Sequence, residues 1–276
     1  MKKSKAISLQ IIIFSVILIF GFSLTMMNIF GITQDVRPKI NNVELLRFKN
    51  DVELTYEQSQ KLLNWKPSDN EAMFADRVNH VVSKSLAHIE WDKFDARKYN
   101  QLIPIWENYF LYFMGAYSGI PEYERYHFTD YKRSLYRGVG ICGDASMIMS
   151  EVLNKNNINN KIITFPGHVI VSAQINGKEQ MYDPDFGVSL PYSKYEINTK
   201  PSLIIQHYKE KGYSDKEINN LVKRYGGKYQ EWRGVQHFMT NKYYFEKFAY
   251  LMKWPAPLML IGIAVLFLKR RLIKVG

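Results

Sequence analysis

The sequence predicts an α+β fold flanked by two transmembrane helices. Two long apolar runs lie near the ends of the 276-residue chain, over residues 9–30 and 248–268. Between them, patterns with helical periodicity precede and follow a short region in which apolar residues alternate as they do in strands. The 14% of aromatic and 23% of charged residues exclude a disordered chain, and the length allows a sizeable core.

The first apolar run is long enough to cross a bilayer, since about 20 apolar residues span the hydrocarbon core. Residues 9–30 contain no charged side chain, and three lysines precede them in the basic tail 1–8. A cleaved signal peptide has the same order of basic and apolar residues. Because the run is long for such a peptide and no cleavage site with small residues follows it, we expect a retained anchor.

The second run, residues 248–268, contains two prolines and one lysine, Lys253, whose long side chain can reach the membrane interface. Aromatic residues form a belt at its start, and the Lys-Arg-Arg sequence after it is typical of a stop-transfer flank. The belt consists of Tyr243, Tyr244, Phe245, Tyr250 and Trp254. A buried core helix is the alternative, but the basic flank favours a membrane span.

The positive charge is concentrated at the two ends of the chain. The formal net charge is +11, and the tails 1–8 and 269–276 contribute seven basic residues and no acid, which leaves +4 for the remainder. A nucleic-acid partner is therefore not expected. The positive-inside rule places both tails in the cytoplasm. Residues 35–247 would then form a periplasmic or extracellular domain of a protein in a bacterial inner membrane, and the many Lys, Asn, Ile and Tyr residues are typical of low-GC bacteria.

Residues 35–135 and 200–247 are predicted to be mostly helical. A capping box at residues 68–71 opens one helix, in which apolar residues recur at helical spacing up to Ile89. Further helices are expected over residues 103–117, 203–211 and 215–225. No internal repeat and no low-complexity tract divides the sequence between the two apolar runs. Residues 136–190, between the helical parts, are expected to form the core.

The only cysteine, Cys142, lies in a turn that is rich in glycine. The sequence from Gly138 to Gly143 leads directly into a helical pattern, so Cys142 is expected at or just before a helix N-terminus. Backbone N–H groups and the helix macrodipole favour the thiolate there, and the thiolate is the form that attacks carbonyl groups. A single cysteine also excludes an intramolecular disulfide and a multi-cysteine metal site. Asp144 is expected to cap the helix.

A hairpin is predicted where Asn-Gly, at residues 176–177, joins two strand-like runs, because this dipeptide favours a type I′ turn. In the resulting register His168 faces Asp185 and has Asp183 as a diagonal neighbour on the same face of the sheet. An imidazole beside a carboxylate is the arrangement of a general base and the acid that orients it. A further short strand is expected over residues 161–165.

Each of these residues also has a purely structural explanation. A lone cysteine is most often a small core residue, a histidine can simply begin a strand, and Asp-Pro-Asp favours a turn. Their combination is more specific: a cysteine opens a helix, and a histidine and an aspartate follow at the end of a hairpin. This order matches a thiol nucleophile, its base and the acid that orients the base.

The pattern supports a metal site or a nucleotide site less well. Cysteine, histidine and aspartate are metal ligands, but no second cysteine and no closely spaced histidine pair accompanies them, and Glu124 with His127 is an isolated pair. Gly138, Gly140 and Gly143 have the spacing of a dinucleotide fingerprint, yet no apolar strand precedes them and no acid follows at the ribose-binding distance. No metal and no cofactor are therefore expected.

Three segments resemble the motifs of the transglutaminase-like superfamily. They are Gly140-Ile141-Cys142-Gly143-Asp144-Ala145, Gly167-His168-Val169 and Tyr182-Asp183-Pro184-Asp185. The resemblance implies a papain-like α+β core, in which a helix that carries the cysteine packs on an antiparallel sheet. It also implies that Cys142 is the nucleophile, that His168 is the base and that Asp183 orients the imidazole.

The resemblance implies acyl transfer or hydrolysis at an amide or peptide bond through a cysteine thioester. The expected partners are the lipid bilayer and a peptide or protein substrate near the membrane. The Cys142 backbone N–H is expected in the oxyanion hole, and Tyr136, Trp106 and Trp91 are candidates for the second donor. The alternative function is a catalytically silent binding or assembly module of the cell envelope with the same fold.

Overall fold

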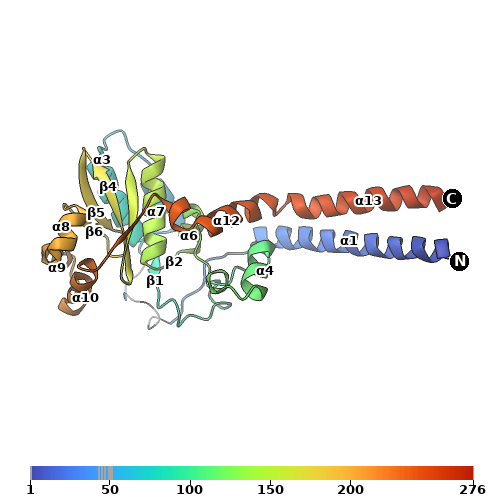
Figure 1. Cartoon of the computed structure of the whole chain (residues 1–276), viewed down its shortest axis with the longest axis horizontal. Coiled ribbons are helices and arrows are strands. Elements are labelled where there is room, and N and C mark those ends of the chain that lie inside the picture. Colours follow the sequence, from blue (N-terminus) through green and yellow to red (C-terminus); the bar gives the residue numbers. More distant parts are fainter. Residues whose placement is uncertain (1, 43, 45, 47, 49–51, 276) are drawn as a thin grey trace. The chain divides into compact units, whose positions relative to one another are not determined.

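The computed structural model is an α+β protein, as the sequence predicts, and it describes residues 2–42, 44, 46, 48 and 52–275 (Figure 1). The chain divides into two compact units. A helical unit comprises residues 1–36, 100–126 and 245–276, and a sheet unit comprises residues 37–99 and 127–244. Residues 100–126, which lie in the middle of the predicted domain 35–247, therefore group with the two ends of the chain.

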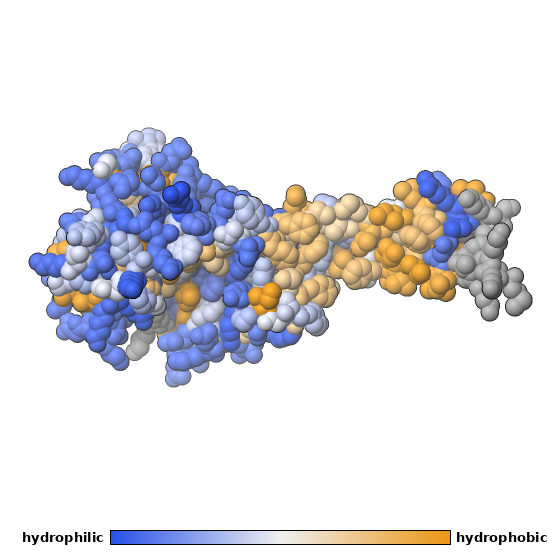
Figure 2. Space-filling view, viewed as in Figure 1, coloured by the Kyte–Doolittle hydropathy of each residue, from blue (hydrophilic) through white to orange (hydrophobic). Residues whose placement is uncertain are grey.

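The helical unit is built around two long helices that run side by side (Figure 1). They are α1 (Lys2–Ile32) and α13 (Pro255–Val275), and the later part of α12 (Thr240–Met252) precedes the second. Two short helices, α4 (Tyr109–Tyr117) and α5 (Pro121–Glu124), complete the unit. The rings of Phe14 and Phe267 stack at 3.7 Å between the long helices, and both helices present a largely hydrophobic surface (Figure 2).

Within the described residues, one helix is long and apolar enough to cross a membrane, over Leu9–Ile32. This segment matches the predicted run 9–30. Helices α12 and α13 pass the same test only as a pair, and they are bent by 47° at the break between Met252 and Pro255. The predicted run 248–268 is thus interrupted, because Pro255 lacks an N–H group and is suited to begin a helix rather than to continue one.

The sheet unit contains an antiparallel sheet with the strand order β6-β5-β4-β3-β7 in its described residues. The strands are β3 (Asn160–Phe165), β4 (His168–Ile175), β5 (Lys178–Asp183), β6 (Val188–Leu190) and β7 (Gln230–Trp232). The predicted hairpin is confirmed: Ile175 pairs with Lys178, and Asn176 and Gly177 have the positive φ angles of a type I′ turn, 50° and 76°. The edge strand β7 is not predicted by the sequence.

Helices cover both faces of the sheet (Figure 1). One face packs on α3 (Glu71–Ser83) and α7 (Cys142–Lys155), and its core includes Val171 and Ala173 of β4. The other face packs on α8 (Lys194–Thr199), α9 (Ile205–Glu210) and α10 (Asp215–Tyr225), and its core includes Ile170. Successive side chains of β4 point to opposite faces of the sheet, so they contribute alternately to the two cores.

The predicted helices are present with different boundaries. The helix after residues 68–71 is α3, and its N-cap is Asn70, whose side chain accepts a hydrogen bond from the N–H of Met73. The helix expected over 103–117 starts only at Tyr109, because Asn108 caps it. The segment 203–211 begins as a 3₁₀ turn, Pro201–Ile204, before α9. Helix α10 occupies the predicted residues 215–225.

Four further elements lead the chain to α7. Helices α2 (Tyr56–Leu62) and α6 (Tyr131–Arg137) pack beside each other, and β1 (Ala87–His88) pairs in parallel with β2 (Val139–Gly140). The two-residue strand β2 directly precedes α7. The sequence does not predict this parallel pair, whose partners are more than 50 residues apart in the chain.

Candidate active site

Cys142 is the first residue of α7, as the glycine-rich turn predicts. Helix α6 ends at Gly138, which has the left-handed φ of 67° that favours glycine, and the chain then enters β2 and α7. One turn into α7, the hydroxyl of Ser146 donates to the carbonyl of Val169 over 2.9 Å. This bond attaches the start of the helix to the start of β4, next to His168.

His168 and Asp183 form a hydrogen-bonded pair in which Nε2 lies 2.7 Å from Oδ2. His168 begins β4 and Asp183 ends β5, so the hairpin register produces the diagonal relationship predicted from the sequence. The side chains are 3% and 0% exposed, and the side chain of Cys142 is close enough to the imidazole of His168 to act on its charge. The structure thus brings together the three residues singled out in the sequence.

Asp185 does not lie opposite His168, and this part of the prediction is wrong. The β4–β5 ladder ends at Val171 and Tyr182, and Oδ1 of Asp185 lies 3.4 Å from Nε2 of His88. The chain turns at Pro184, which has no N–H group to extend the ladder. The Oδ1 atom of Asp183 accepts the N–H groups of Asp185 and of Phe186 in this turn.

The electrostatics of the pair favour its charged form. Burial alone would lower the pKa of His168, but the Asp183 carboxylate and the Cys142 side chain raise the pKa to about 10. Burial alone would raise the pKa of Asp183, but His168 and the hydroxyl of Tyr208 hold that pKa below its ordinary value. His168 is therefore held as an imidazolium between the carboxylate of Asp183 and the side chain of Cys142.

Two buried tyrosines complete the surroundings of the carboxylate. The hydroxyl of Tyr208 donates to Oδ2 of Asp183 over 2.6 Å, and the hydroxyl of Tyr225 donates to the same atom over 3.1 Å. Burial raises the pKa of both phenols well above the ordinary value, so both remain neutral donors. No motif in the sequence identifies them, although a tyrosine on the apolar face of a helix signals a buried hydroxyl that needs a partner.

Asp144 caps α7, as expected, and it also joins a second cluster of charges. Its Oδ2 atom accepts the N–H of Ile141 at 3.0 Å and lies 2.8 Å from Nδ1 of His127. Burial would raise the pKa of Asp144, but His127 and the buried Arg137 hold it below the ordinary value. These contacts fix the backbone of Ile141, the residue immediately before Cys142.

The candidates for the second oxyanion donor occupy different places. Trp91 stacks on the ring of His127 at 4.2 Å, and Tyr136 is 40% exposed and packs against Tyr56. Trp106 belongs to the helical unit. Their role in an oxyanion hole stays a prediction. In the part of the chain that the structure describes, no group of three or more His, Cys, Asp or Glu side chains is arranged to hold a metal ion.

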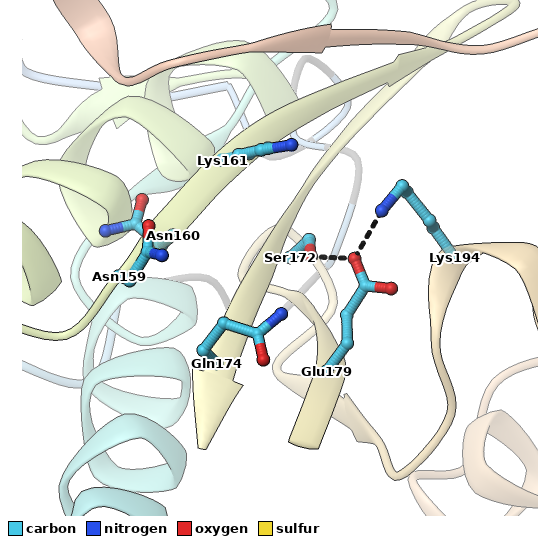
Figure 3. Close-up of a pocket in the computed structure, with 7 residues that line it drawn as sticks. All are labelled: Asn159, Asn160, Lys161, Ser172, Gln174, Glu179 and Lys194. Atoms are coloured by element: carbon cyan, nitrogen blue, oxygen red, sulfur yellow. Dashed lines mark hydrogen bonds and ion pairs between the residues drawn. The ribbon is translucent and has the colours of Figure 1, made fainter. Parts of the chain in front are cut away.

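A small polar pocket of about 90 Å³ lies beside β3, β4 and β5 (Figure 3). It is lined by Asn159, Asn160, Lys161, Ser172, Gln174, Glu179 and Lys194. Glu179 accepts hydrogen bonds from Ser172 at 2.6 Å and from Lys194 at 2.7 Å, and Lys194 also lies 3.4 Å from Glu231 of β7. Lys161 lies 2.6 Å from Glu231, so two lysines neutralise the two carboxylates. The contacts connect β5 to β7, and the pocket is explained by the fold.

The chain was compared with protein-family models, with curated proteins and with solved structures, and no match was found in any of the three comparisons.

Proposed function

We propose that the chain is a membrane-anchored, transglutaminase-like thiol enzyme that acts on an amide or peptide bond outside the cytoplasm. The observation that carries the proposal is the contact of Cys142, at the start of α7, with the imidazole of His168, which Asp183 holds at 2.7 Å. A nucleophile, a base and an orienting acid in this arrangement are the signature of nucleophilic catalysis, to which acyl transfer belongs.

The reaction would proceed in two halves. The Cys142 thiolate attacks the carbonyl carbon of the substrate, and the imidazolium of His168 protonates the departing amine as the carbon–nitrogen bond breaks. The acyl group then remains on sulfur as a thioester. His168 next takes a proton from water or from a second amine, whose attack releases the acyl group from Cys142. Water as the acceptor gives hydrolysis, and an amine gives transfer.

The fold supports each step of this reaction. The backbone N–H of Cys142 points out of a helix N-terminus, where it is available to the oxyanion of the tetrahedral intermediate. Asp183 is itself held by two phenol hydroxyls and two backbone N–H groups, so the imidazole of His168 has a rigid partner. The exposure of the side chains is also suitable: Cys142 is partly exposed, whereas His168 and Asp183 are buried.

The proposed location is the cell membrane, with two spans and both ends in the cytoplasm. Leu9–Ile32 is long and apolar enough to span, and α13 packs along it and ends in a basic segment. With both helices in the bilayer, the bend between α12 and α13 would lie near the outer interface. The substrate would then be a peptide or protein near the outer surface of the membrane.

The proposal is tested by alkylation of Cys142 with iodoacetamide in the detergent-solubilised full chain, measured by mass spectrometry as a function of pH. The chain has one cysteine, so the reagent can label only one thiol. The variant Cys142→Ser measures the background labelling. We expect rapid labelling well below the pKa of about 8.5 of an ordinary thiol. His168→Ala should slow the reaction at neutral pH, because it removes the cation beside the sulfur.

His207→Ala is the matched control, since His207 is a partly exposed histidine of α9 that packs on Tyr192. It should retain the wild-type profile. Slow labelling with the same ordinary thiol profile in the wild type and in His168→Ala would overturn the catalytic proposal. A catalytically silent binding module would then be favoured.

A further inference from the structure

Helix α4 has a composition that is unusual for a water-exposed helix. Its sequence, Tyr-Phe-Leu-Tyr-Phe-Met-Gly-Ala-Tyr, contains no charged residue, and the chain contains none from Asn108 to Pro121. Leu111 is fully buried, but Phe113, Tyr117 and Ile120 are 44%, 74% and 40% exposed. An uncharged helix with apolar residues on several sides is typical of a segment that is enclosed by protein or by lipid.

The contacts of α4 place it beside the end of α1 and the beginning of α13. Within the helical unit, the hydroxyl of Tyr109 donates to the carbonyl of Lys253 over 3.1 Å, at the break before α13. Shortly before α4, the carbonyl of Trp106 lies so close to Gly31, near the end of α1, that a side chain at Gly31 would overlap it. The helix therefore lies at the level of Ile32 and of Pro255, where the apolar segments end and begin.

The apolar surface of α4 is also continuous with that of its neighbours. The ring of Phe110 packs on the ring of Phe248 in α12, with their centroids 5.7 Å apart, and Phe248 and Leu251 are 48% and 72% exposed. In the space-filling view, the hydrophobic surface of α1 and α13 extends to the end of the long helices at which α4 lies (Figures 1 and 2). Tyrosine and tryptophan are enriched at the interfaces of membrane proteins, because their rings have both an apolar and a polar part.

We propose that α4 is a third membrane contact, in which Phe113, Tyr117 and Ile120 lie in the interfacial layer of the bilayer that α1 and α13 cross. The partner is the lipid surface itself, because the exposed apolar residues adjoin the membrane-spanning helices. This inference rests on the proposed membrane anchoring. It adds a segment that lies on the membrane without crossing it, since nine residues of helix are too short to span.

The test uses spin labels on single cysteines in the full chain, reconstituted into nanodiscs of phosphatidylcholine and phosphatidylglycerol. Cys142→Ser removes the native thiol, and Tyr117→Cys then introduces the label at the most exposed aromatic residue of α4. Two control positions are labelled in the same way. The first is Ile19→Cys, at a side chain in the middle of α1 that is 64% exposed. The second is Tyr195→Cys, at a side chain of the sheet unit that is 70% exposed.

Collision rates with oxygen, which concentrates in lipid, and with a water-soluble nickel chelate report the depth of each label. We expect the oxygen-to-nickel ratio at Tyr117→Cys to be several-fold higher than at Tyr195→Cys and lower than at Ile19→Cys. A ratio at Tyr117→Cys equal to that at Tyr195→Cys, with a high ratio at Ile19→Cys, would overturn the third contact and leave the anchoring intact. A low ratio at Ile19→Cys as well would overturn both.

Discussion

The hydroxyl of Tyr208 donates to Oδ2 of Asp183 over 2.6 Å, and Nε2 of His168 lies 2.7 Å from the same oxygen atom. The carboxylate is therefore shared between a cation and a neutral donor. The tyrosine comes from α9, which covers the sheet face opposite to α7. Side chains from both covering layers of the sheet thus meet at the proposed catalytic pair.

The variant Tyr208→Phe is expected to lower the free energy of unfolding by about 1.5–3 kcal/mol, the usual worth of a hydrogen bond to a charged group. The change removes one donor from Asp183 and leaves the ring in place. Denaturant titration of the full chain in detergent measures the effect. Tyr195→Phe is the control, since Tyr195 is 70% exposed, and it should have no measurable effect. Equal stability of the two variants would contradict the role assigned to the Tyr208 hydroxyl.

The pair of His168 and Asp183 should make the stability depend on pH on the alkaline side. Burial lowers the pKa of His168, but Asp183 and Cys142 raise it to about 10 in the folded chain, against 6.5 for an ordinary histidine. The raised pKa of His168 contributes its full stabilisation below about pH 6.5, and this contribution is lost as the pH rises through about 10.

The free energy of unfolding of the wild type should therefore fall through this window relative to His168→Asn, by at most about 1.4 kcal/mol per pH unit. Denaturant titrations of both proteins at a series of pH values measure the difference. A constant difference between them across the window would show that His168 is not held as a cation by its neighbours.

Two glycines of the turn at Cys142 should respond to alanine in opposite directions. A Cβ at Gly140 would lie 2.8 Å from the Cβ of Asp144, whereas a Cβ at Gly143 would meet no atom within 4 Å. Gly140→Ala should displace the Asp144 carboxylate from the N–H of Ile141 and cost about 0.5–2 kcal/mol, as the loss of a helix cap does. Gly143→Ala should add about 0.4–1 kcal/mol, because alanine loses less backbone freedom on folding than glycine and its Cβ is accommodated here. Thermal unfolding of both variants measures the contrast, and a destabilised Gly143→Ala would contradict it.

The two-span topology is tested with alkaline phosphatase and green fluorescent protein fused at two positions. A fusion near Asn198 should give active phosphatase, which folds outside the cytoplasm, and a fusion after Gly276 should give fluorescence inside. Phosphatase activity at both positions would show that the segment of α12 and α13 does not cross the membrane. The reverse pattern at the two positions would show that the orientation is inverted.

Patterns among residues that are close in the sequence predict several features of this protein. Asn176 and Gly177 set the hairpin turn, and the period of two along the strands then places His168 and Asp183 on one face of the sheet. The helical period and the glycines before Cys142 likewise predict the start of α7. These features depend on residues that are close in the sequence, so the pattern of the residues alone determines them.

The partners of the site depend on packing between distant segments. Tyr208 and Tyr225 reach Asp183 only because α9 and α10 fold onto the sheet. Likewise, Nε2 of His88 in β1 lies 3.4 Å from Oδ1 of Asp185, which is about 100 residues away in the chain. No spacing in the sequence encodes such contacts. A buried carboxylate such as that of Asp183 needs hydrogen-bond donors. Only the tertiary structure decides which side chains supply them.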